Sequence, residues 1–87
     1  MRRITKVHMS GSGHGHEHIA EVVYEDGTTA YRASVSSMVT YLDGGGDAKV
    51  TDGQNMVDVG VVNVVPKHIR THADGKWTNN LLALPRY

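Results

Sequence analysis

Apolar and polar side chains alternate along much of this chain, as they do in half-buried β-strands. The segments with strand-like composition are residues 3–9, 18–25, 28–31, 48–52 and 56–65. Asp26-Gly27 is typical of a tight hairpin, and residues 52–55 predict a second turn. Consecutive strands joined by such short turns indicate a sheet that is mainly antiparallel.

The period changes between residues 34 and 43, where apolar side chains recur every three or four positions. Val35, Met38, Val39 and Leu42 form one stripe of a helix. Ser34 is the expected N-cap, and Gly44 is the expected left-handed stop. This is the one helix that the pattern predicts.

The last third of the chain combines its most apolar strand with its most basic segment. The valines of residues 57–65 change faces across Gly60-Val61-Val62, which predicts a bulge or a strand buried on both sides. Residues 67–72 are expected to form an edge strand after Pro66, with a turn at Asp74-Gly75. A leucine cluster at residues 81–84 then packs the tail.

These elements predict one α+β domain over residues 1–87. We expect a mainly antiparallel four- to five-stranded sheet with one helix packed on one face. The run at residues 10–16 is rich in glycine and histidine and predicts a mobile loop.

Composition narrows the class of protein. Eighty-seven residues supply a single hydrophobic core, and the absence of cysteine excludes disulfides and thiolate metal sites. With no Phe and one Trp there is little aromatic area to bury, so a homo-oligomer stays open as a further source of stability. No apolar run is long enough to span a bilayer and no signal-peptide pattern follows the basic start, so we expect a cytoplasmic protein without a membrane partner.

The net charge is zero, yet the charges are unevenly distributed. Residues 1–6 carry three basic side chains and no acid, and residues 67–87 carry four against one acid. Residues 7–66 carry eight acids against two bases. The basic ends form one basic face only if the fold brings them together, and a simple scatter of charge is the alternative.

Three histidines near the glycine-rich loop are candidate metal ligands: His14, His16 and His18. In an extended chain their imidazoles point to one side, as a Zn, Ni or Cu site requires. Against this, ordering ligands in a loop costs entropy, and a solvated loop explains the same residues.

The second candidate site lies on the C-terminal strand and turn. Its proposed ligand-binding residues are Lys67, His68, Arg70, Thr71, His72, Lys76 and Trp77. Alternation places the side chains of His68, Arg70 and His72 on one face, a row of donors suited to phosphate or carboxylate. Trp77 offers a stacking plane for a base. The competing interpretation is an ordinary edge strand kept basic to prevent pairing with other chains.

Catalytic motifs are weak. The run Gly11-Ser12-Gly13-His14-Gly15 lacks the Lys-Ser/Thr pair of a phosphate-binding loop, and no Gly-x-Ser-x-Gly elbow occurs. No nucleophile, base and orienting group can be assigned from spacing, and no motif requires a cofactor. We therefore expect a protein that is not an enzyme.

Two segments carry a resemblance to a known family. In the first half of the chain, the resemblance lies in Arg3-Ile4-Thr5-Lys6-Val7 and His16-Glu17-His18-Ile19. In the second half, it lies in the closing run from Lys67 to Pro85. On these residues the chain resembles a family of small bacterial and phage proteins catalogued as domain of unknown function 3892. The resemblance implies a free-standing cytoplasmic domain and supplies no catalytic residues. It directs attention to the same C-terminal segment.

Our leading hypothesis is a small non-enzymatic binding module whose basic C-terminal edge takes an anionic, nucleotide-like ligand, with nucleic acid as the second choice. The alternative is a protein–protein interaction module, a phage or bacterial accessory factor that engages a host protein. Zero net charge and a helix without Arg or Lys argue against sequence-specific DNA recognition.

Overall fold

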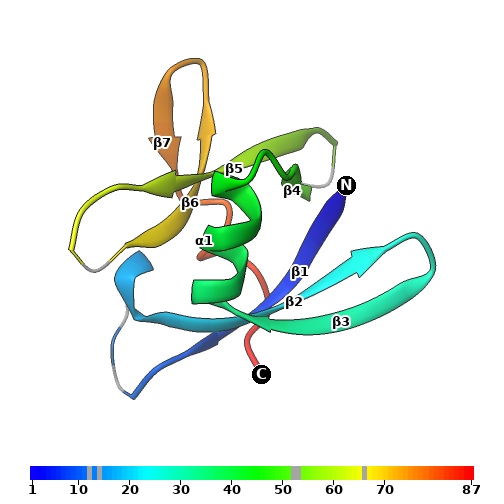
Figure 1. The fold of residues 1–87 in the computed structure, drawn as a ribbon, viewed down its shortest axis with the longest axis horizontal. Coiled ribbons are helices and arrows are strands. Elements are labelled where there is room, and N and C mark those ends of the chain that lie inside the picture. The colour runs from blue at the N-terminus through cyan, green and yellow to red at the C-terminus, as the bar shows by residue number, and fades with distance from the viewer. Residues whose placement is uncertain (12, 14, 52–53, 66) are drawn as a thin grey trace.

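The computed structural model describes residues 1–11, 13, 15–51, 54–65 and 67–87. Seven strands and one short α-helix account for most of these residues (Figure 1). The elements are β1 (Arg2–Met9), the 3-10 helix η1 (His16–His18), β2 (Ile19–Asp26), β3 (Thr29–Ser34), α1 (Val35–Asp43), β4 (Ala48–Thr51), β5 (Met56–Val62), β6 (His68–Ala73) and β7 (Lys76–Thr78). Parts of the predicted loop at 10–16 and of the turn at 52–55 lie outside the described residues.

All seven strands belong to one mixed sheet in the order β3-β2-β1-β4-β5-β6-β7. The expectation of a four- to five-stranded, mainly antiparallel sheet was therefore wrong. Neighbouring strands are antiparallel except β1 and β4, which run parallel where Arg2 pairs with Ala48. The parallel pair arises because the chain crosses over through β2, β3 and α1 before β4 returns to β1.

A single α-helix is present among the described residues, as predicted, and it begins and ends close to the expected positions. The Ser34 side chain caps it by accepting from the backbone N–H of Ser37 at 3.1 Å. The left-handed residue after the helix is Gly45, with φ 94°, whereas Gly44 has φ −82°. The predicted stop was therefore one residue too early. With nine residues, α1 is not long enough to cross a membrane, and none of the described helices is.

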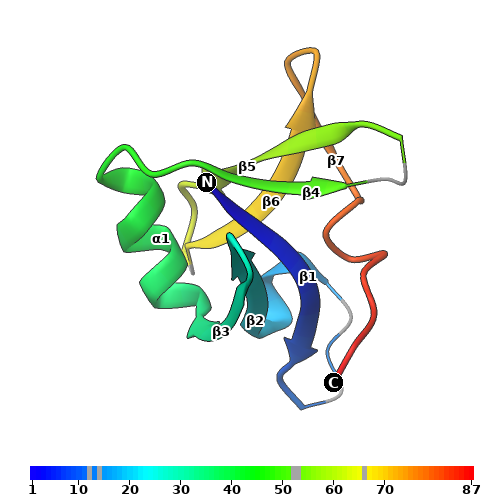
Figure 2. The same cartoon turned by 90° about the vertical axis from the view of Figure 1, so that its right-hand side faces the viewer.

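The core lies on the inner face of the curved sheet. The helix α1 lies between the β1–β3 half and the β5–β7 half and packs on strands of both (Figure 1). The C-terminal segment closes the core from the other side (Figure 2). The core side chains are Ile4, Val7, Ile19, Val22, Tyr24, Val35, Met38, Ala48, Val50, Val59, Ile69 and Leu81.

A register shift in β1 explains why its sequence pattern was ambiguous. Ile4 and Val7 are three positions apart, so a regular strand would place them on opposite faces. The shift between Ile4 and Lys6 brings both inside, opposite Tyr24 and Val22. Ile4 is 1% exposed and Val7 is 0% exposed.

The C-terminal tail lies beside the end of β1 that is farther from the N-terminus (Figure 2). One edge of β1 pairs with β2 and the other edge has two partners. At Arg2 and Arg3 this other edge pairs with β4, and at Val7 it pairs with the C-terminal tail. The N–H of Val7 donates to the carbonyl of Pro85 at 3.0 Å, and the N–H of Tyr87 donates to the carbonyl of Val7 at 3.2 Å. The C-terminus is thus part of the sheet.

Candidate functional site

The strand β6 is an interior strand, which corrects the expectation that residues 67–72 form a sheet edge. It pairs with β5 on one side and with β7 on the other. The edge is β7, reached through a hairpin in which Asp74 (φ 54°) and Gly75 (φ 77°) are both left-handed. This β6–β7 hairpin projects from the body of the protein (Figure 1).

Alternation along β6 separates the predicted ligand-binding residues into two groups. Ile69 and Thr71 face the core and are 0% exposed. The Thr71 hydroxyl is bonded to that of Thr78 at 2.6 Å, so Thr71 cannot reach a ligand on the outer face. His68, Arg70 and His72 face the opposite way, which we call the outer face of β6.

The outer-face side chains differ in what they contact. His68 is only 9% exposed, beside η1, which packs on β6. An Nη atom of Arg70 donates to Asn79 Oδ1 at 3.2 Å and to the carbonyl of Thr78 at 3.5 Å, so its position is fixed. Lys67 comes just before β6, at the end far from the β6–β7 hairpin, and its Nζ lies 3.5 Å from Asp43 Oδ2.

Three of the predicted residues come together at the hairpin. His72, Lys76 and Trp77, with Gly75, line a shallow hollow of about 250 Å³. The His72 and Trp77 rings meet edge to face, with centroids 5.6 Å apart and an interplanar angle of 82°. Trp77 is 45% exposed, an unusual exposure for the largest apolar side chain of the protein. We call this hollow the ring platform.

Gly60 on β5 makes room for the ring platform. A Cβ atom at this position would lie 3.0 Å from His72 Cδ2 and 3.5 Å from Trp77 Cζ3. Both rings therefore extend over the sheet toward a residue that has no side chain. The β5–β6 register is regular through Gly60, so neither the predicted bulge nor burial on both faces occurs there.

The histidine-rich segment is arranged differently from the extended chain that the metal hypothesis assumed. His16 and His18 lie in η1; His16 is 8% exposed, and the His18 side chain is 45% exposed. His14 lies outside the described residues. Among the residues that are described, no group of three or more His, Cys, Asp or Glu could hold a metal ion.

Burial and neighbouring charges lower the pKa of His16. Burial is the main reason that the pKa of His16 is below its ordinary value, and the charges of Arg70 and His68 act in the same direction. The negative charge of Glu17 opposes them. His16 is therefore protonated less readily than a free imidazole.

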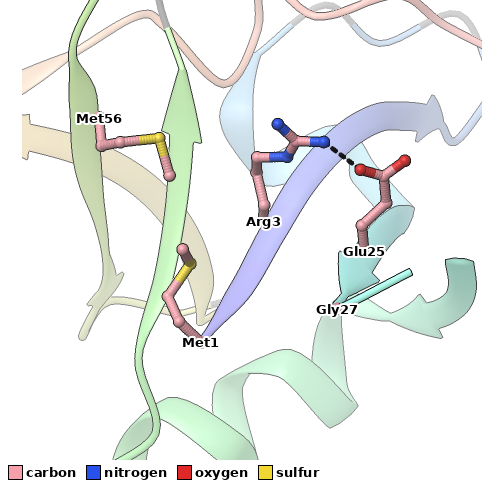
Figure 3. A pocket seen from close by; sticks show the side chains of 5 residues that line it. All are labelled: Met1, Arg3, Glu25, Gly27 and Met56. Carbon is pink, nitrogen blue, oxygen red and sulfur yellow. Dashed lines mark hydrogen bonds and ion pairs between the residues drawn. The ribbon is translucent and has the colours of Figure 1, made fainter. Parts of the chain in front are cut away.

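A second hollow, of about 320 Å³, was not predicted from the sequence. It is lined by Met1, Arg3, Glu25, Gly27 and Met56 (Figure 3). The two methionine side chains point toward one another, and Arg3 and Glu25 form an ion pair. Because Arg3 and Glu25 pair with each other, the side chains of this hollow left for a ligand to contact are chiefly the two flexible methionines. It provides less chemical selectivity than the ring platform.

Comparison with known proteins gives a family. The sequence profile described as "Protein of unknown function (DUF3892)" matches residues 3–85. The chain belongs to this family. Searches of the curated proteins and of the solved structures each gave no match. Membership of DUF3892 confirms the resemblance seen in the sequence and carries no activity with it, so the function has to be argued from the site.

Proposed function

We propose that this DUF3892 protein is a small non-enzymatic binding module that takes an anionic, nucleotide-like ligand at the ring platform. The observation that supports this is an exposed indole, Trp77, held edge to face against His72 with Lys76 in the same hollow. An aromatic face and a cation side by side match a base and a phosphate.

The size of the hollow limits what it holds. Pockets that enclose a drug-sized ligand usually measure about 300–1,000 Å³. A shallow hollow of about 250 Å³ accommodates one base or one end of a nucleotide and leaves the rest outside. A nucleoside monophosphate or a terminal nucleotide of a single strand fits this description.

Trp77 is the only tryptophan, so its fluorescence reports on the platform directly. We expect AMP to quench it. Loss of one charge-assisted hydrogen bond, about 1.5–3 kcal/mol, predicts that Lys76→Gln weakens AMP binding roughly tenfold or more. Lys67→Gln is the matched control, because it removes the same charge at the far end of β6, where Lys67 faces Asp43.

An unchanged fluorescence spectrum at saturating AMP, adenosine and single-stranded oligonucleotide would overturn the proposal. So would equal losses in the two lysine variants. Binding of the oligonucleotide without AMP would identify nucleic acid as the ligand class.

A protein partner is the second candidate, and the feature that favours it is β3. This strand forms the other edge of the sheet, and five of its six side chains are exposed. An edge strand presents backbone donors and acceptors to an added strand, either from another protein or from a second copy of this chain. Size-exclusion chromatography with light scattering would detect a homo-oligomer. Affinity capture in high salt with nuclease would detect a stoichiometric partner, and absence of both would remove this candidate.

A further inference from the structure

Within the described part of the chain, two buried nitrogen atoms have no hydrogen-bond partner: Nε2 of His16 on η1 and Nε of Arg70 on β6. They come from residues 54 positions apart in the sequence, brought together because η1 packs on β6. Buried polar atoms without a partner cost free energy and are rare in folded proteins. Two of them on elements in contact indicate a group that the fold is arranged to receive.

The charges around His16 indicate whether the group bound there is a cation or an anion. Arg70 and His68 both act on His16 as positive neighbours, and Glu17 is the one negative neighbour. Glu17 is exposed, and its carboxylate is held by its own backbone N–H, which lowers its pKa. A metal cation here would face the permanent charge of Arg70, whereas an anion would be attracted by it.

The geometry of Arg70 favours an oxyanion in particular. Its guanidinium is held at one end by Asn79 Oδ1 and the carbonyl of Thr78, which leaves Nε–H free to donate elsewhere. A group held in place before binding loses little freedom on binding. Other atoms of Arg70 reach solvent, whereas Nε of Arg70 and Nε2 of His16 are buried, so an anion reaches both nitrogen atoms only where η1 parts from β6.

We propose that Arg70 Nε and His16 Nε2 donate to one phosphate-class oxyanion bound between η1 and β6. We call this the anion seat. It lies on the same face of β6 as the ring platform, with Arg70 two positions from His72, and it is made by different atoms. The proposal goes beyond the nucleotide-like ligand at Trp77 and holds or fails separately from it.

The test is a titration of the full chain with inorganic phosphate. Two-dimensional NMR and isothermal titration calorimetry measure the binding. We expect phosphate to shift the backbone signals of η1 and β6. Arg70→Lys keeps the charge and loses the Nε donor, so it should weaken phosphate binding at least tenfold. Arg32→Lys is the matched control, because Arg32 is an exposed arginine that lies near Glu21 on another part of the sheet. Trp77→Leu should leave phosphate binding unchanged.

Because Arg70 also bonds Thr78 at the end of β7 and the adjacent Asn79, each variant is first checked by circular dichroism. If Arg70→Lys destabilises the fold, His16→Ala serves as a second variant, because it removes the other donor of the anion seat and should also weaken phosphate binding. Failure of millimolar phosphate to shift η1 in the wild type would overturn the anion seat, as would equal loss in the Arg70→Lys and Arg32→Lys variants.

A further comparison separates the seat from the platform and identifies the source of the phosphate. Competition between inorganic phosphate and AMP that is lost in Arg70→Lys and kept in Lys76→Gln would show that the phosphate of a nucleotide occupies the seat. Phosphate binding that persists with AMP bound would show a separate site for free phosphate, and both results support the seat. Adenosine binding alone, without phosphate binding, would retain the ring platform and overturn the seat.

Discussion

Gly60→Ala tests whether the ring platform binds ligand, because it changes the platform from beneath with little change to the fold. The added methyl would lie 3.0 Å from His72 Cδ2, 3.2 Å from His72 Nε2 and 3.5 Å from Trp77 Cζ3. Ordinary carbon contacts are about 3.5–4.0 Å, so the His72 ring must move by several tenths of an ångström. The Trp77 ring packs against His72 and moves with it.

The effect of Gly60→Ala on stability should be small. Gly60 lies in a regular strand, where alanine is favoured over glycine by roughly 0.5–1 kcal/mol. Displacement of a partly exposed ring opposes this gain. We expect the free energy of unfolding to change by about 1 kcal/mol or less, which is a shift in Tm of roughly 4–8 °C at most for a domain of this size.

The effect on binding should be larger than the effect on stability. Base–aromatic stacking contributes about 1–3 kcal/mol per base, so a platform that is misplaced loses about five- to 150-fold in affinity for AMP. Calorimetric titration of AMP and thermal unfolding on the same samples measure the two quantities together. The Trp77 emission spectrum should shift as well.

Gly46→Ala is the matched control for this experiment. A Cβ atom there would lie 2.5 Å from the Tyr41 ring. That ring cannot move freely, because its hydroxyl bonds Asp47 and its face lies 3.8 Å from the Arg2 guanidinium. We expect a loss of about 1–3 kcal/mol in stability from this overpacking, with AMP affinity unchanged. Wild-type affinity in Gly60→Ala, or lowered affinity in Gly46→Ala, would refute the reasoning.

Three further predictions concern stability. Leu81→Ala removes a side chain that is 0% exposed and should cost about 2–5 kcal/mol in urea unfolding, since the cavity lies where the tail meets the core. Ser34→Ala removes the N-cap of α1 and should cost about 0.5–2 kcal/mol in the same assay. The pKa of His16 is lowered below 6.5 in the folded state, so the unfolded chain binds the proton more tightly. Its contribution to stability is complete above pH 6.5 and is lost as the pH falls through the folded pKa; a Tm that is equally pH-dependent in His16→Gln would contradict this.

The sequence predicted the features that depend on a few adjacent residues. Both hairpins were expected at Asp26-Gly27 and Asp74-Gly75, and Gly27, Asp74 and Gly75 do adopt left-handed conformations. The helix was expected because its cap and its apolar stripe lie within one segment. Such signals can be read from the sequence because the conformation of a turn or a helix end is determined by a few neighbouring residues.

The features that failed depend on contacts between distant segments. The parallel pairing of β1 with β4 joins residues about 46 positions apart, and no local pattern specifies it. The three-residue strand β7 is too short to show alternation. The sheet was therefore predicted with too few strands and without its parallel pair.

The candidate site was predicted in part for the same reason. Alternation correctly separated the outer face of β6 from Ile69 and Thr71. It gave no indication that η1 packs beside His68, or that the rings of His72 and Trp77 extend over Gly60. Glycine in a valine-rich strand was the available signal, because a strand interior that tolerates glycine often has another group lying close to its backbone.

The pairing of β1 with the tail has a consequence for biosynthesis. β1 is made well before Pro85 and Tyr87, so the edge of β1 that pairs with β4 has no partner around Val7 until those residues are made. At about 5–20 residues per second, the 78 residues after Met9 take roughly 4–16 s to make. For that time a partly buried strand presents unpaired backbone to other nascent chains. The order of synthesis thus leaves part of β1 exposed to misassembly for longer than a hairpin strand, whose partner follows it directly in the sequence.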